Sequence, residues 1–62
     1  MNLKDKRISK GMSQSQLAKA SDVSVRIIQY YEQGYRDINQ ASASTVRALS
    51  KALGCKMEDI ME

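Results

Sequence analysis

The stretch Ser13–Gly34, SQSQLAKASDVSVRIIQYYEQG, has the pattern of two short helices separated by a tight turn. Ser13 is followed three positions later by Gln16, which is the arrangement of a capping box at the start of a helix. We therefore expect a helix from about Gln14 to Ala20, with Leu17 on its buried side.

A second helix is predicted from about Val25 to Gln33. Ser24 is a natural N-cap for this helix, and Gly34 suits the left-handed conformation that ends many helices. Asp22 stands in the turn between the two helices. Asp tolerates the left-handed conformation better than most residues, so the turn can take either that conformation or another geometry.

The second helix divides into a buried side and a presented side. At about 100° per residue, Ile27, Ile28 and Tyr31 fall within roughly 100° of arc, which predicts a stripe facing the core. The opposite side carries Val25, Arg26, Gln29, Tyr30 and Gln33. This mostly polar side is expected to be available to a partner.

Short elements flank this unit on both sides. The sequence predicts a helix from about Leu3 to Ser9, a loop from Tyr35 to Ala43, a helix ending near Leu53 and a last short helix within Cys55 to Met61. Leu3 and Ile8 give the first helix a thin apolar stripe, and either Ser42 or Ser44 caps the helix that ends near Leu53. The expected fold is therefore all-α, a compact domain of five helices spanning residues 1–62.

Composition narrows the class of protein. A chain of 62 residues holds one domain, and 42% hydrophobic with 27% charged residues favours a folded chain over a disordered one. The sequence has a single cysteine, Cys55, so it cannot form an internal disulfide, and it has no histidine to complete a zinc site. No metal or cofactor is therefore expected. The sequence offers no nucleophile beside a base and no Gly-rich phosphate loop, which argues against an enzyme. Without a membrane-length apolar run or a signal-peptide pattern, the expected location is the cytoplasm.

The net charge of +3 is unevenly distributed. Residues 1–36 hold seven basic against three acidic side chains, whereas residues 37–62 hold three basic against four acidic ones. A basic first half is consistent with a polyanionic partner, although many soluble helical proteins share such asymmetry.

Several motifs together resemble the phage-repressor and Cro-like helix-turn-helix family, also called the XRE family. They are Gly11-Met12-Ser13-Gln14-Ser15-Gln16-Leu17-Ala18, Val23-Ser24, Ile28, Glu32-Gln33-Gly34 and Ala52-Leu53-Gly54. The resemblance extends from about Leu3 to Met61. It implies a lambda-repressor-like domain that binds double-stranded DNA sequence-specifically and regulates transcription, with its third helix in the major groove.

The resemblance also implies roles for individual residues. The base-facing positions of the family correspond to Ser24, Val25, Arg26 and Tyr30. The positions that contact the DNA backbone correspond to Gln14, Gln33 and Arg36. Arg7 and Glu32 match a pair that joins the first helix to the third through an ion pair.

The chemistry of these side chains fits the implied roles. The planar donor fork of Arg26 matches the O6 and N7 acceptors of guanine, and Val25 offers apolar contact to a thymine methyl group. Tyr30 can reach either a base edge or a phosphate through its hydroxyl, and Ser24 can serve as both helix cap and DNA contact.

Double-stranded DNA is thus the expected partner, and no small-molecule ligand or membrane is expected. Family members usually act as dimers on palindromic operators. For this chain the sequence does not decide whether a homodimer forms in solution or only on DNA. The alternative is a protein-interaction module with incidental DNA binding. A surface for a protein partner should be apolar, whereas Arg26, Gln29 and Gln33 make the presented side polar.

Overall fold

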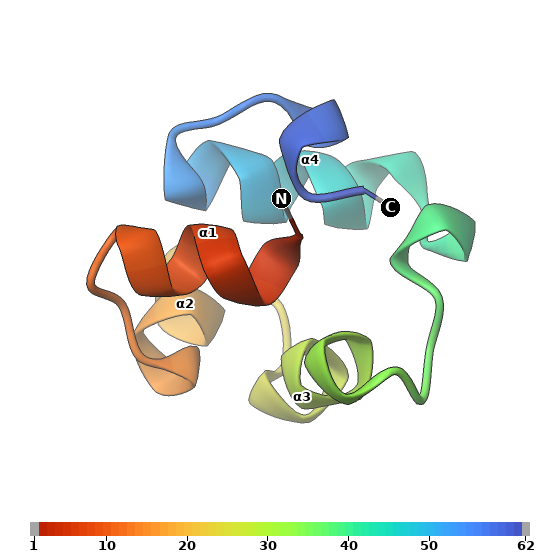
Figure 1. Ribbon diagram of the computed structural model, residues 1–62, viewed down its shortest axis with the longest axis horizontal. Coiled ribbons are helices and arrows are strands. Elements are labelled where there is room, and N and C mark those ends of the chain that lie inside the picture. The colour runs from red at the N-terminus through yellow and green to blue at the C-terminus, as the bar shows by residue number, and fades with distance from the viewer. Residues whose placement is uncertain (1, 62) are drawn as a thin grey trace.

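The computed structural model describes residues 2–61, and these form an all-helical bundle without strands. The elements are α1 (Leu3–Ser9), α2 (Gln14–Ser21), α3 (Val25–Gln33), η1 (Ile38–Gln40), α4 (Ala43–Leu53) and η2 (Met57–Asp59), where η marks a 3₁₀ turn. In Figure 1, α4 lies along the top of the view and α3 along the bottom, with α1 and α2 on the left between them. The all-α class expected from the sequence is confirmed.

Side-chain caps start each of the α-helices. Ser13 Oγ accepts the Gln16 N–H at 3.0 Å, and Gln16 Oε1 accepts the Ser13 N–H at 2.8 Å, so the expected capping box is formed. Asn2 caps α1 through the Asp5 N–H at 2.9 Å. At α4 the cap is Ser42, which accepts the Thr45 N–H at 3.2 Å. These contacts satisfy backbone donors that would otherwise lack partners at a helix start.

The turn between α2 and α3 takes the left-handed geometry. Asp22 has φ 59° and ψ 27°. Helix α2 extends one residue beyond the expected end, to Ser21, whose buried hydroxyl donates to the Leu17 carbonyl at 2.7 Å within the last turn. The chain therefore reverses on a single strained residue, and α3 begins directly after the Ser24 cap.

The expected fifth helix is not confirmed. Between Cys55 and Met61 the chain forms one 3₁₀ turn, and the structure has four α-helices among residues 2–61. Lys56 is extended (φ −82°, ψ 155°), and its N–H donates to Asp59 Oδ2 at 3.1 Å, which closes a tight turn. So short a segment cannot offset the cost of nucleating an α-helix. Ile60 nevertheless reaches the core and is fully buried.

The segment expected to be a loop contains a core residue. Within Tyr35 to Ala43 the chain forms η1, and Ile38 is only 4% exposed. Asp37 Oδ1 accepts the Asn39 N–H at 2.9 Å and starts this turn. A single apolar residue among polar neighbours produces no periodicity, which is why the sequence pattern did not indicate its burial.

One apolar cluster joins all the helices. Its buried members are Leu3, Leu17, Ile28, Ile38, Val46, Leu49, Leu53 and Ile60. Helix α2 packs against both α3 and α4, α1 packs against α3, and η2 packs against α4. The core thus lies between α4 and the α2–α3 pair, and the outer side of α3 faces away from it.

Two isoleucines on the apolar stripes expected from the sequence are not buried. Ile8 is 56% exposed, and Ile27 is partly exposed, whereas its neighbour Ile28 is completely buried. Because α1 and α3 each contact the bundle along one narrow line, a residue about 100° away from that line reaches only its edge. Tyr31 is packed against the core as expected.

None of the helices among residues 2–61 combines the length and hydrophobicity of a bilayer span.

Candidate nucleic-acid interface

The outer face of α3 presents the side chains that the sequence assigned to a partner. Val25 is 37% exposed, and Ser24, Arg26 and Gln33 are exposed as well, whereas Tyr30 is partly exposed. Ser24 Oγ accepts the Arg26 N–H at 3.2 Å, so its hydroxyl serves as the helix cap. The buried Ile28 on the other side holds the helix against the core. The resulting face is polar except at Val25.

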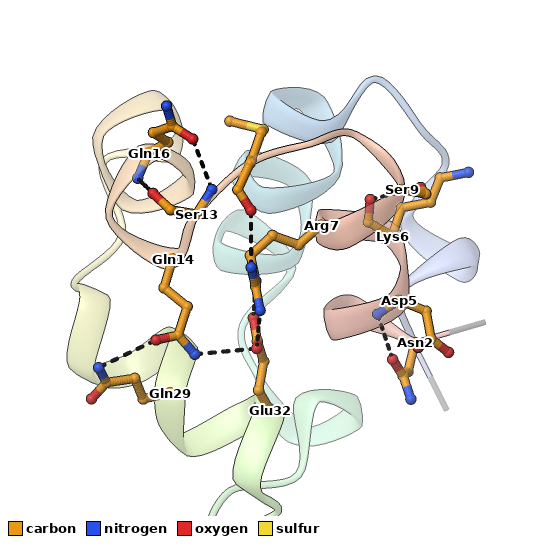
Figure 2. A network of polar contacts seen from close by, with 11 residues as sticks. Asn2, Asp5, Lys6, Arg7, Ser9, Ser13, Gln14, Gln16, Gln29 and Glu32 are labelled. Atoms are coloured by element: carbon orange, nitrogen blue, oxygen red, sulfur yellow. Dashed lines mark hydrogen bonds and ion pairs between the residues drawn. The ribbon is translucent and has the colours of Figure 1, made fainter.

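An ion pair fixes α3 relative to α1. Arg7 Nε donates to Glu32 Oε2 at 2.7 Å, and Arg7 Nη2 donates to Glu32 Oε1 at 2.9 Å (Figure 2). The two side chains are 12% and 3% exposed. Hydrogen bonding to Glu32 raises the pKa of Arg7 above its ordinary value, and the negative charge of the carboxylate raises it further. Burial lowers this pKa, but by less than the pairing raises it. The expected pair is therefore present and bidentate.

The same guanidinium also holds the entrance to α2. Arg7 Nη1 donates to the Met12 carbonyl at 2.9 Å, directly before the Ser13 cap. One side chain thus joins the end of α1, the connection to α2 and the last turn of α3. Such a contact fixes the orientation of α3 more than it adds stability, because desolvation of the charges offsets much of their attraction.

Gln14 extends this network to the outer face of α3. Its Nε2 donates to Glu32 Oε1 at 3.2 Å, and its Oε1 accepts from Gln29 Nε2 at 3.4 Å (Figure 2). The start of α2 is thereby connected to two successive turns of α3. Gln29 was not among the site residues expected from the sequence. Its place one turn after Arg26 and one turn before Gln33 is the signal that indicates it.

A second cluster lies at the C-terminal end of α3. The Arg36 guanidinium carbon lies 5.6 Å from the centroid of the Tyr30 ring. The Tyr35 ring meets Tyr30 edge-on, with centroids 6.1 Å apart and planes at 84°. Gly34 is left-handed (φ 82°), and the N–H groups of Tyr35 and Arg36 donate to the Tyr30 carbonyl at 2.9 and 3.3 Å. This is the hydrogen-bonding pattern of a left-handed helix cap that returns the chain over the last turn.

Lys4 joins the expected residues in one open hollow. The hollow is lined by Lys4, Arg7, Ser13, Gln14, Glu32 and Gln33. Since Glu32 is paired with Arg7, the exposed cation there is Lys4, next to the N-terminal end of α2. The positive end of a helix dipole and a nearby ammonium group both favour an anion such as phosphate. The sequence pattern alone does not distinguish Lys4 from an ordinary solvated charge.

The arrangement therefore combines a polar, exposed helix with cations on either side of it. Lys4 lies beside the start of α2, and Arg36 lies beyond the end of α3. A helix between flanking cations can enter a groove while both sides contact the phosphate backbone.

Comparison with known proteins gives one match. A family model described as helix-turn-helix matches residues 3–60. Neither the search of curated proteins nor the search of solved structures returned a match. The matched range contains α1 to α4 and the whole polar network around Arg7 and Glu32. The chain therefore belongs to the helix-turn-helix family of phage-repressor and Cro-like (XRE) DNA-binding proteins.

Proposed function

We propose that this DNA-binding protein is a sequence-specific transcriptional regulator that inserts α3 into the major groove of double-stranded DNA. The observation that carries the proposal is the exposed polar face of α3, held in a fixed orientation by the buried Arg7–Glu32 pair. Base readout needs a helix whose side chains are presented at a constant angle. The ion pair supplies that constraint from the flank of the helix, through Glu32 in its last turn.

The first turn of α3 is proposed to read bases. Arg26 donates to the O6 and N7 acceptors of a guanine, and Val25 contacts a thymine methyl group. Ser24 lies at the helix start and adds a contact from its hydroxyl, which also accepts the Arg26 N–H. Gln29 follows one turn later and is oriented by Gln14. This arrangement resembles direct readout by the N-terminal half of a recognition helix.

Phosphate contacts are proposed on both sides of the reading helix. Gln14, Gln33 and Lys4 line the hollow near the start of α2, and Arg36 lies past the end of α3. Contacts of this kind position the protein on the duplex and carry no sequence information themselves. Their number is measurable as the slope of log affinity against log salt.

A homodimer on a palindromic site is proposed to assemble on the DNA. The Cα envelope measures 25 × 22 × 19 Å. The centres of two half-sites one helical turn apart are separated by about 34 Å, which exceeds every dimension of one copy. Neighbouring copies would then meet only at their edges. A small contact of that kind favours pairing on the duplex over pairing in free solution.

The test is selection of random duplex DNA by the purified protein, followed by anisotropy titration of the selected duplex across salt concentrations. A palindromic consensus with steeply salt-dependent affinity is expected, and its half-site spacing tests the proposed dimer. Enrichment of no sequence, with equal weak binding to every duplex, would reject the regulator and leave a generic polyanion surface. A search for a protein partner would then be the next step.

The Arg26→Ala variant tests the reading helix within the same assay. We expect it to weaken binding to the consensus by about 1–3 kcal/mol for each half-site and to relax one base position in each. The matched control is Lys51→Ala, which removes the same charge from the last turn of α4, an element on the opposite side of the bundle from α3 (Figure 1). The control should keep the wild-type consensus. An unchanged consensus for Arg26→Ala would remove Arg26 from the residues that read bases.

A further inference from the structure

Arg36 is held by Tyr30 through two independent contacts. Its backbone N–H donates to the Tyr30 carbonyl at 3.3 Å, which fixes where the chain leaves α3. Its guanidinium lies over the Tyr30 ring, 5.6 Å from the centroid. An arginine over an aromatic face is attracted by the negative charge density of the ring, so the side chain is restrained in addition to the backbone.

The surroundings leave the Arg36 guanidinium available to an anion. Among residues 2–61 the recorded ion pair joins Arg7 and Glu32, so Arg36 has no carboxylate partner there. The nearest acidic residue in sequence is Asp37, whose Oδ1 accepts the Asn39 N–H. Contact with an aromatic face leaves the edge of a guanidinium, where its N–H donors lie, open to phosphate oxygens.

The same geometry limits what Tyr30 itself can do. One face of its ring is covered by Arg36, and the Tyr35 ring packs against it edge-on. The Tyr30 ring therefore supports both neighbouring side chains, Arg36 and Tyr35. The family resemblance placed Tyr30 among the base-facing residues, whereas the structure places its ring beneath a cation.

We propose that Tyr30 is a positioning residue that acts on DNA through Arg36: its ring holds the Arg36 guanidinium in place as a preformed clamp for a backbone phosphate at the C-terminal end of α3. This inference rests on the proposed DNA-binding function. A restrained side chain avoids the ordering cost that a free arginine meets on binding. Tyr30 thereby contributes affinity without reading a base.

The test is a double-mutant cycle with Tyr30→Leu, Arg36→Ala and the double variant, measured by anisotropy on the selected duplex across salt. We expect Arg36→Ala to lower the salt slope by about 0.9 for each half-site occupied, which is the value for one lost phosphate contact per copy. Tyr30→Leu should weaken binding about two- to tenfold when Arg36 is present, because the arginine must then be ordered on binding. In the Arg36→Ala background the same substitution should have little effect, and the selected consensus should not change.

Tyr30→Phe is the matched control, because it keeps the ring and removes only the hydroxyl. It should bind with wild-type affinity and salt slope. A second measurement needs no DNA: the NMR signals of the Arg36 side chain should be shifted upfield by the Tyr30 ring, and the shift should persist in Tyr30→Phe and disappear in Tyr30→Leu. Thermal melting of each variant shows whether it is folded.

Three results would overturn the inference. Equal losses for Tyr30→Leu with and without Arg36 would show that the ring acts independently of the arginine. A loss for Tyr30→Phe as large as that for Tyr30→Leu would show that the hydroxyl contacts DNA directly. Absence of the ring-current shift in the wild-type protein would remove the physical basis. Each of these can occur while the wild-type protein selects a clear consensus, so they are distinguishable from failure of the proposed function, in which no sequence is selected.

Discussion

Removal of the Glu32 carboxylate should be among the most damaging single substitutions in this protein. The carboxylate is 3% exposed and accepts hydrogen bonds from Arg7 Nε, Arg7 Nη2 and Gln14 Nε2 at 2.7, 2.9 and 3.2 Å. In Glu32→Ala the Arg7 guanidinium keeps only the Met12 carbonyl as a partner while 12% of its side chain reaches water. Breaking a buried ion pair from one side costs about 3–5 kcal/mol.

The partial exposure of Arg7 places the expected loss at the lower end of that range, about 3 kcal/mol. A domain of this size has a free energy of unfolding of about 3–9 kcal/mol in total. Glu32→Ala should therefore lose at least about a third of the free energy of unfolding at 25 °C. For so small a domain the corresponding fall in Tm is about 12–24 °C.

The assay is urea unfolding at pH 7 followed by far-UV circular dichroism, with Glu58→Ala as the control. Glu58 is an exposed carboxylate in η2, and its removal should change stability by less than about 0.5 kcal/mol. The double variant Arg7→Met/Glu32→Leu should recover most of the loss, because it leaves no unpaired buried charge. A loss below about 1 kcal/mol for Glu32→Ala would refute the reasoning, because so small a loss is typical of a solvent-exposed ion pair.

The pH dependence of this contribution follows from the pKa of Arg7. Pairing with Glu32 raises that pKa in the folded state. A group whose pKa is raised by folding stabilises the folded state fully when the pH is below its unfolded-state pKa. That stability is lost only as the pH rises through its folded-state pKa. Both values lie far above neutrality for an arginine. The stability that Arg7 protonation provides should therefore be the same at pH 7 and pH 9.

Two further substitutions test the backbone and the core. Asp22→Gly should stabilise the protein by about 0.5–1 kcal/mol, because glycine adopts the left-handed conformation without the steric cost that Asp bears there, whereas Asp22→Ala should destabilise the protein. Urea unfolding of both variants measures the sign of each change. A loss of stability in the glycine variant would contradict the turn geometry. Ile38→Ala should cost about 2–4 kcal/mol, as for other packed core isoleucines, and its midpoint in urea should fall well below that of Gln40→Ala, which changes an exposed residue of the same turn. Equal midpoints would show that Ile38 is not part of the core.

The elements that local sequence signals define were predicted closely. The expected bounds of α1 and α3 agree with the structure, and α2 is longer by the single residue Ser21. The last helix failed because a few apolar residues with helical spacing do not make a segment long enough to nucleate an α-helix. Burial of Ile27 was overestimated, because the sequence shows a helical stripe but not how much of that stripe a small bundle can cover.

Part of the candidate site could also be predicted from local sequence signals, and part could not. The exposed positions Ser24, Arg26 and Gln33 follow from the helix and its face. The Arg7–Glu32 pair came from family resemblance, since nothing local connects residues 25 positions apart. Gln29 and Lys4 were missed as site residues because their significance lies in which side chains stand beside them.

The sequence by itself determined where the helices start and stop and which face of α3 is polar. Caps such as Ser13 and left-handed residues such as Gly34 act through hydrogen bonds within about six positions, so their effect can be read from the order of residues alone. Only the tertiary structure decided that Ile38 enters the core, that Gln14 reaches Gln29, and that Arg36 is held over Tyr30. The physical reason is that these contacts depend on how the helices pack and how the chain leaves α3, and packing is a property of the whole bundle rather than of any one stretch.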